Sequence, residues 1–232
     1  YWLALPVFEQ AYATARGQQQ HLTLPDGSAL HLDTATRLNA RLYRQRREVM
    51  LIEGQARFEV QADARRPFHV LAGGARITVV GTRFTVRRTR TGLDAGRTLV
   101  AVEEGHVRVT RAAEVADSAT LEGAELTVGL AVIVDEQGRW GPVAPLSQVS
   151  PAATSDWQRG RVCFDQTPLA QAIAEFERYG PTRLVVHDPT VAALPVGGSY
   201  SVDHFSRFVE ALPQVLPVRL VRRGEVMEVV AQ

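Results

Sequence analysis

Between His21 and Asp135 the chain consists of short segments in which apolar and polar residues alternate, spaced eight to twelve residues apart. This period of two is typical of β-strands that bury one face. Glycines and one Asp-Gly pair separate the segments, and such residues favour the tight turns that join neighbouring strands. No stretch of helical length in this region repeats its apolar residues every three or four positions. The pattern predicts an all-β region, and a sandwich, a jelly roll and a short β-solenoid all agree with it.

Two segments of this region resemble each other: EGQARF at residues 53–58 and EGHVRV at residues 104–109. Each contains an acidic residue, a glycine, a variable residue, an apolar residue, an arginine and a second apolar residue. The likeness predicts a β architecture that turns two similar corners.

A further glycine interrupts what reads as one long strand, ITVVGTRFTV at residues 77–86. Gly81 and the small hydroxyl residue Thr82 occupy its middle. A glycine within a strand commonly marks a β-bulge or the close approach of another backbone. We therefore expect one of these two features at Gly81.

Charge and metal-ligand spacing limit the possible functions. The net charge of +1 predicts no binding to nucleic acid. All 26 basic residues are arginines, and the runs that contain Arg47 and Arg87 are interpreted as solvated strand faces. The six histidines and the single cysteine, Cys163, form no metal-binding motif, so we expect no metal and no cofactor.

The sequence changes character at residues 138–155, where three prolines and many small residues predict a linker. After Asp156, apolar strand patterns alternate with two helical patterns in the order β-α-β-β-α-β-β. Thr167 and Asp203 are expected to cap the two helices, and Pro213 is expected to end the second. The helices are recognised by apolar residues at i, i+3, i+4 and i+7, which are Leu169, Ala172, Ile173 and Phe176, then Phe205, Phe208, Val209 and Leu212. This order predicts a small α+β domain of two βαβ halves.

Several motifs occur in the order and spacing of a known family: LPDGSALHLDTATRL, EGQARFEV, RPFHVLAGG, VVGTRFTV and VEEGHVRV. Together they resemble the periplasmic part of the FecR family of anti-sigma regulators. The later WQRGRVCFDQTPLAQAIAEFERYG resembles the segment that leads into a module similar to the secretin and TonB short N-terminal (STN) domain. The resemblance implies a juxtamembrane segment at residues 1–16, an all-β FecR-type domain at 17–137, the linker at 138–155 and an STN-like α+β domain at 156–232.

The resemblance also implies a location and partners. Members of the family are single-pass inner-membrane proteins of Gram-negative bacteria, which places this chain in the periplasm and makes YWLALPVF the edge of a missing membrane span. The expected partner is the N-terminal signalling domain of a TonB-dependent outer-membrane transporter, whose iron-siderophore-type signal is relayed to an extracytoplasmic-function sigma factor. The sigma factor would be bound only by a cytoplasmic segment absent from this sequence, and periplasmic or intramembrane proteases would act in the relay.

Some members of the family are cut at a Gly-Thr bond that corresponds to Gly81-Thr82. The Thr82 hydroxyl would attack the Gly81 carbonyl, move the acyl group from nitrogen to oxygen, and leave an ester for water to hydrolyse. Glycine lacks the Cβ that would block this attack. Gly81 and Thr82 are therefore a candidate self-cleaving bond in a chain that is otherwise not expected to be an enzyme.

The STN-like domain is the expected docking surface, because short strands leave sheet edges with unpaired backbone groups. The candidate contact residues are Leu184 and Val186 in RLVVH and Tyr200 in GGSYS. Alternatives are a secretin-like protein and a carbohydrate-binding periplasmic β-protein. The acidic pair Glu103 and Glu104 argues against a glycosidase, because adjacent strand residues point to opposite faces.

Overall fold

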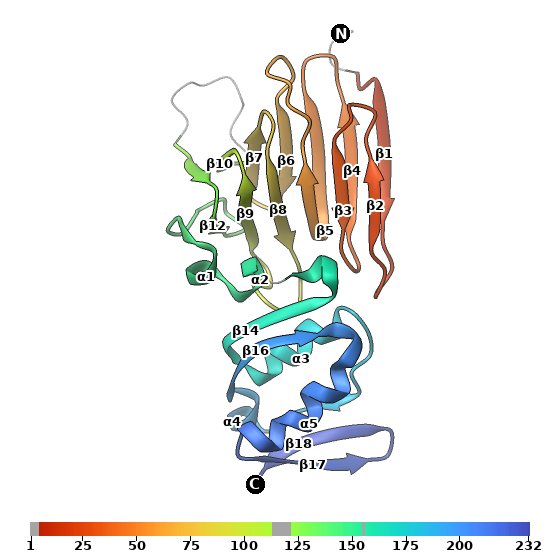
Figure 1. Cartoon of the computed structure of the whole chain (residues 1–232), viewed down its shortest axis with the longest axis vertical. Coiled ribbons are helices and arrows are strands. Elements are labelled where there is room, and N and C mark those ends of the chain that lie inside the picture. Colours follow the sequence, from red (N-terminus) through yellow and green to blue (C-terminus); the bar gives the residue numbers. More distant parts are fainter. Residues whose placement is uncertain (1–4, 113–121, 155) are drawn as a thin grey trace.

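The computed structural model describes residues 5–112, 122–154 and 156–232, and Figure 1 shows an elongated molecule with two parts. Strands β1 to β13 lie at one end, and strands β14 to β18 lie with the longer helices at the other. The predicted mainly β plus α+β fold is confirmed. Residues 1–4 of the expected juxtamembrane segment lie outside the described residues.

The β-rich part is one 13-stranded sheet that curls into two layers. The first layer has the strand order β1-β4-β5-β6-β7-β10-β11, and the second has the order β2-β3-β5-β8-β9-β12-β13. Neighbouring strands are antiparallel except β5 and β6, which are parallel. The strands are β1 (Phe8–Ala13), β2 (Gln20–Thr23), β3 (Ala29–Leu32), β4 (Arg37–Leu42), β5 (Arg47–Glu59), β6 (Phe68–Ala72), β7 (Ala75–Val79), β8 (Arg83–Arg88), β9 (Thr98–Glu104), β10 (His106–Arg111), β11 (Ala124–Thr127), β12 (Leu130–Val134) and β13 (Ala144–Pro145).

Strand β5 belongs to both layers because it changes partners at Gly54. Its first half pairs with β4 and β6, and its second half pairs with β3 and β8. Gly54 has a φ of +106°, and a Cβ there would lie 2.5 Å from the Cα of Thr36, so this corner requires glycine. Gly105, with a φ of +86°, occupies a second corner between β9 and β10, which lie in different layers. The two similar corners predicted from EGQARF and EGHVRV are confirmed.

The prediction of one strand over residues 77–86 is wrong. Strand β7 pairs with β6 and β10 in the first layer, whereas β8 pairs with β5 and β9 in the second. Gly81 and Thr82 therefore lie at a corner where the chain crosses between layers. A Cβ on Gly81 would lie 2.7 Å from the Cα of Ala62, so the close approach of another backbone explains this glycine.

Apolar side chains from both layers fill the space between them. Phe58, Phe68 and Phe84 are fully buried at the centre of this core. The ring of Phe58 stacks on that of Phe84 with 5.1 Å between centroids, and it meets the ring of Phe68 edge-on at 6.2 Å. Burial of each ring contributes about 1.5–3 kcal/mol before side-chain entropy is subtracted, so this cluster holds the layers together.

The predicted linker contains secondary structure. It includes β13 and the short helices α1 (Leu146–Val149) and α2 (Pro151–Thr154). Trp140 forms an isolated β-bridge with Val134, and Ala152 of α2 is buried. Helices α1 and α2 lie against β12 and β9, so the segment covers one end of the β-rich part.

The C-terminal part confirms the predicted order β-α-β-β-α-β-β, with three short elements added. Strand β14 pairs with β16, and a second sheet has the order β15-β18-β17. In Figure 1 the helices α3 and α5 lie between these two sheets. The elements are η1 (Trp157–Arg159), β14 (Arg161–Pro168), α3 (Leu169–Glu177), β15 (Leu184–Val185), α4 (Pro189–Ala192), β16 (Pro195–Ser201), η2 (Val202–His204), α5 (Phe205–Val215), β17 (Val218–Arg223) and β18 (Val226–Ala231).

Three predicted helix boundaries are wrong. Thr167 lies in β14, and its hydroxyl bonds locally to Asp165 instead of capping α3. Asp203 lies in the 3₁₀ turn η2, so the chain makes a tighter turn before α5 begins. Pro213 lies inside α5, which continues to Val215. A proline this close to the end of a helix removes only one intrahelical hydrogen bond, so the last turn still forms.

Candidate functional site

The junction between the two parts is built around Glu175 of α3. Its carboxylate accepts two hydrogen bonds from Arg87 of β8, at 3.0 and 2.5 Å, and one from Arg178 at 2.7 Å. The backbone N–H of Leu93 donates a further bond at 2.9 Å. The side chains of Arg87 and Glu175 are each only 2% exposed. Although burial alone raises the pKa of Glu175, the guanidinium groups of Arg87 and Arg178 outweigh it and lower that pKa to about 2.

A second carboxylate, Asp33, lies on the β-rich side of the same cluster. It accepts a hydrogen bond from the Tyr179 hydroxyl at 2.9 Å and one from Arg178 at 3.4 Å. The Thr34 hydroxyl donates to the Arg178 carbonyl at 2.7 Å. Burial raises the pKa of Asp33, because the nearby guanidinium groups offset only part of the lost hydration. Burial and the Asp33 carboxylate also raise the pKa of Tyr179 well above its ordinary value.

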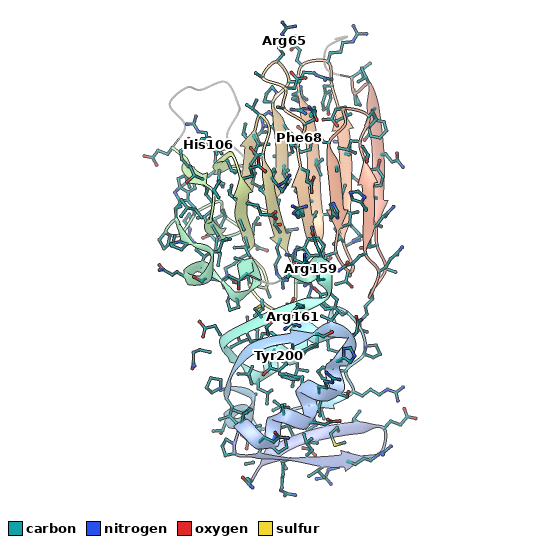
Figure 2. The ribbon with its side chains drawn as sticks, in the orientation of Figure 1. Arg65, Phe68, His106, Arg159, Arg161 and Tyr200 are labelled. Atoms are coloured by element: carbon teal, nitrogen blue, oxygen red, sulfur yellow. The ribbon has the colours of Figure 1, made fainter. Side chains whose placement is uncertain are left out.

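Apolar packing crosses the junction as well. Figure 2 labels Arg159 and Arg161 on the segment where the two parts meet. The hydrophobic core of the C-terminal part continues into β9, β12 and the loop before β9, through Leu93, Leu99, Ala101 and Ala131. The two parts are therefore joined by one continuous interior of apolar contacts and buried ion pairs.

The interpretation of the arginine runs as solvated strand faces is wrong for Arg47 and Arg87. Both guanidinium groups are buried, with Arg87 against Glu175 and Arg47 against Asp26. Arg47 and Asp26 are separated by 2.9 Å between Nη1 and Oδ2. Strand alternation predicts the face on which a side chain lies. It does not predict the partners of these two arginines, because those partners are distant in the sequence.

The candidate self-cleaving bond lies at the crossing between the layers. The Thr82 hydroxyl donates a hydrogen bond to the His106 carbonyl at 2.9 Å, and the Thr82 carbonyl accepts one from the N–H of Val60 at 3.0 Å. Gly105 approaches so closely that a Cβ on it would lie 3.1 Å from the Thr82 Oγ1 and 3.2 Å from the Gly81 carbonyl oxygen. Thr82 is therefore buried. The backbone of His106 accepts the hydrogen bond of its side chain, and the backbone of Val60 donates to its carbonyl group.

Arg47 braces the two segments that meet at this corner. Its guanidinium donates to the carbonyls of Gln61 at 2.7 Å, Arg66 at 2.8 Å and Val80 at 3.3 Å. Gln61 and Val80 directly precede Ala62 and Gly81, the two residues in closest approach. Arg47 thus adds a side-chain connection to the backbone hydrogen bond that Asp63 donates to the Val80 carbonyl at 3.0 Å.

A cavity of about 340 Å³ opens beside the Gly81-Thr82 peptide. Glu59, Arg83 and Glu104 line it together with the corner residues. An Arg83 Nη1 lies 2.8 Å from the Glu104 carboxylate, and the Glu59 carboxylate accepts a hydrogen bond from Arg57 and lies 3.9 Å from the Arg83 Nε. The structure thus places two arginine-paired carboxylates in the lining of the same cavity as the buried Thr82, a grouping that the sequence order did not reveal.

The three predicted partner-contact residues lie in the C-terminal part but not on one surface. Leu184 in β15 is buried and Val186 is half-buried against the same core. Tyr200 in β16 packs on Phe164, Phe176 and Phe208, and its hydroxyl donates to the Gly197 carbonyl at 2.8 Å. Figure 2 shows Tyr200 on the ribbon that faces the helices. A partner would therefore reach mainly the outer strands around these residues.

Two further features bear on the site. No group of three or more His, Cys, Asp or Glu side chains within the described residues is arranged to hold a metal ion. Among the same residues, none of the helices combines the length and the apolar character needed to cross a membrane.

Comparisons with known proteins agree with this architecture. Residues 10–108 match the family model described as FecR protein. Two crystal structures of a candidate anti-sigma factor from Parabacteroides distasonis have TM-scores of 0.75 and 0.76 with this chain at 22% sequence identity. They cover 97% and 96% of this chain, and 100% and 99% of the solved chains. No curated protein sequence matches the chain. Residues 10–108 thus form a FecR-type region, and the resemblance to the FecR family predicted from the sequence motifs is confirmed.

Proposed function

We propose that this chain is the periplasmic sensor region of a FecR-type anti-sigma regulator in the inner membrane of a Gram-negative bacterium. The family match supports a role in sigma-factor regulation. The observation that carries the sensor role is the junction at Glu175, where an STN-like α+β part is fixed to the FecR-type region by a buried ion cluster. A partner that binds the C-terminal part therefore acts on a part that buried ion pairs and apolar contacts hold to the FecR-type region.

The partner that fits this arrangement is the N-terminal signalling domain of a TonB-dependent outer-membrane transporter. Such a partner is a small periplasmic domain, and the C-terminal part offers it short strands with open edges at the end of the molecule farthest from β1. The iron-siderophore-type signal would reach the sigma factor through regulated proteolysis. Binding would supply the differential interaction that shifts the regulator between two states.

Isothermal titration calorimetry of the purified chain against transporter signalling domains from the same genome tests this proposal. We expect saturable one-to-one binding to one of these domains. The control titrates the whole chain with signalling domains from an unrelated genome. Equal binding to the unrelated domains, or no binding of the whole chain to any signalling domain of its own genome, would contradict the proposal.

We propose self-cleavage at Gly81-Thr82 as a second property of the same region. The supporting observation is the position of the bond at a corner braced by Arg47, with the Thr82 hydroxyl hydrogen-bonded to the His106 carbonyl and carboxylates in the adjoining cavity. Ester hydrolysis after the acyl shift yields two fragments that remain associated, because β5 and β7 of the first fragment pair with β8 and β10 of the second. Denaturing gels and mass spectrometry should show a fragment that begins at Thr82 and disappears in Thr82→Ala, while an intact wild-type chain after long incubation would refute the reaction.

A further inference from the structure

Strand β17 is the longest regular strand in the C-terminal part with an unpaired edge. It pairs only with β18, at the end of the order β15-β18-β17. The edge strand β15 has only two residues, and β16 contains Gly197 and Gly198, the latter with a φ of +114°. Helix α2 lies along β14. Figure 1 places the hairpin of β17 and β18 at the end of the molecule opposite the β-rich part. Nothing in the described chain obstructs this edge.

The register of the hairpin shows which backbone groups point outward. Gln232 donates to the Pro217 carbonyl at 3.1 Å, which makes residues 217 and 232 a hydrogen-bonded pair. Hydrogen-bonded pairs alternate along an antiparallel ladder, so residues 219, 221 and 223 also direct their N–H and C=O groups to β18. The backbone groups of Leu220 and Arg222 therefore point away from β18. A strand added here would find both donors and both acceptors free.

The side chains of β17 indicate the chemistry of such a strand. Arg219, Val221 and Arg223 lie on the outer face, and the two arginines are exposed. Arg223 pairs with Glu228 at 2.9 Å, whereas Arg219 forms no ion pair within the described residues. Opposite charges on facing strands stabilise pairing. The outer face thus favours a strand with acidic side chains opposite Arg219 and Arg223 and an apolar one opposite Val221.

The inner face adds an apolar position next to Leu220. A cavity of about 460 Å³ lies between α5 and this sheet, and its lining combines apolar residues such as Phe205, Val209 and Leu220 with polar and charged residues such as Arg183, Glu210 and Arg222. Side chains of an added strand alternate between the outer face and this inner side. An apolar side chain on the inner side would reach the mouth of the cavity next to Leu220. The occupant that satisfies both faces has acidic residues opposite Arg219 and Arg223 and apolar residues opposite Leu220 and Val221.

We propose that the outer edge of β17 receives an extended strand of the transporter signalling domain, through backbone hydrogen bonds to Leu220 and Arg222 and ion pairs to Arg219 and Arg223. This inference rests on the proposed function. It differs from the contact residues predicted by sequence, because the edge lies on β17 and not on β15 or β16.

The substitution Arg222→Pro tests the backbone pairing directly. Proline removes the outward N–H of residue 222 and blocks strand addition, but it leaves the ladder to β18 intact because that N–H does not take part in it. Arg222→Ala is the matched control, since it loses the same charge and keeps the N–H. With the signalling domain that binds the wild-type chain in calorimetry, we expect Arg222→Pro to bind about ten-fold more weakly than Arg222→Ala, the equivalent of one or two lost hydrogen bonds.

Amide hydrogen exchange of the wild-type chain keeps the test valid should Arg222→Pro fold poorly. The amides of Leu220 and Arg222 should exchange quickly in the free chain and slowly in the complex, while those of Arg219 and Val221 stay protected in both. Equal affinity of the two variants, or unchanged exchange at Leu220 and Arg222 in the complex, would overturn the inference. The arginines of β17 would then serve to prevent unspecific pairing of an exposed edge strand. Absence of binding by the wild-type chain would instead overturn the proposed function, and this inference with it.

Discussion

The substitution Glu175→Gln tests whether the buried ion cluster holds the two parts of the molecule together. Glutamine keeps the size and the planar end of glutamate but removes its charge. Arg87 and Arg178 would then retain Asp33 as the only carboxylate in the cluster, and Arg87 does not contact it. A buried guanidinium without its counter-charge is strongly unfavourable. We therefore expect a large loss of stability with little change in shape.

Two routes give the same magnitude for this loss. Breaking a buried ion pair by removing one partner costs about 3–5 kcal/mol. The pKa of Glu175 is lowered from 4.5 to about 2, and at about 1.4 kcal/mol per unit this corresponds to about 3 kcal/mol. Because the folded pKa is the lower one, this contribution is fully present above pH 4.5 and is lost as the pH falls through about 2. At neutral pH the whole effect should be visible.

Urea denaturation at pH 7, followed by tryptophan fluorescence and circular dichroism, measures the loss. Trp157 lies buried in η1 at the junction, so its emission should report separation of the two parts. The matched control is Glu177→Gln in the same helix, where the exposed pair with Arg16 also crosses the junction and where a glutamine oxygen can still accept the two hydrogen bonds that Thr182 donates. Exposed pairs contribute about 0–1 kcal/mol. A loss below 1 kcal/mol for Glu175→Gln, or equal losses for both variants, would refute the role assigned to the cluster.

Three further outcomes are expected. Asp33→Asn should lower the free energy of unfolding by less than Glu175→Gln does, because burial raises the pKa of Asp33 and asparagine resembles the neutral form of aspartate. Urea denaturation under the same conditions measures this difference. Gly81→Ala should lower the melting temperature through the clash with Ala62 and cost about 1–3 kcal/mol, while Gly180→Ala, with no neighbour within 4 Å, should cost far less. Burial and neighbouring arginines lower the pKa of His69 from 6.5 to about 4, so its contribution is present above pH 6.5 and is lost as the pH falls toward 4. The free energy of unfolding of the wild-type chain should therefore fall between pH 7 and pH 5, and that of His69→Gln should fall by about 2 kcal/mol less over the same range. Urea denaturation at both pH values measures the two losses.

The strand-rich architecture and its corners could be predicted from local patterns. Alternation fixes which side chains share a face, and Gly54 and Gly105 occupy the corners that their two similar segments indicated. The helical stripes also placed Phe176 and Phe208 in the core of the C-terminal part. These features depend on residues close together in the sequence, where spacing alone carries the information.

The junction could not be predicted in this way. Arg87 alternates like any polar strand residue, and its partner Glu175 lies outside the apolar stripe of α3, so each reads as exposed when taken alone. Both are buried because a second structural part covers each of them. The need for glycine at position 81 was equally unpredictable, because the backbone that leaves no room for a Cβ there belongs to Ala62 in another segment of the chain. Residues whose partners are far away in sequence lack the local signal on which pattern reasoning depends.

Helix α3 connects the proposed docking edge with the candidate cleavage site. Its Phe176 packs against Phe205 and Phe208 of α5, at 4.8 Å between ring centroids in both cases, and α5 lies over the sheet that ends in β17. The neighbouring Glu175 is held by Arg87 on β8, the strand that follows directly after Thr82. A strand added to β17 that shifted α5 would thus displace α3 and move β8, because the ring contacts of Phe176 and the ion pair of Glu175 connect these elements directly. Amide hydrogen exchange at residues 83–88 of the wild-type chain should therefore change when the signalling domain binds. If the same binding leaves exchange at these residues unchanged in Glu175→Gln, the ion cluster is the connection between the two sites.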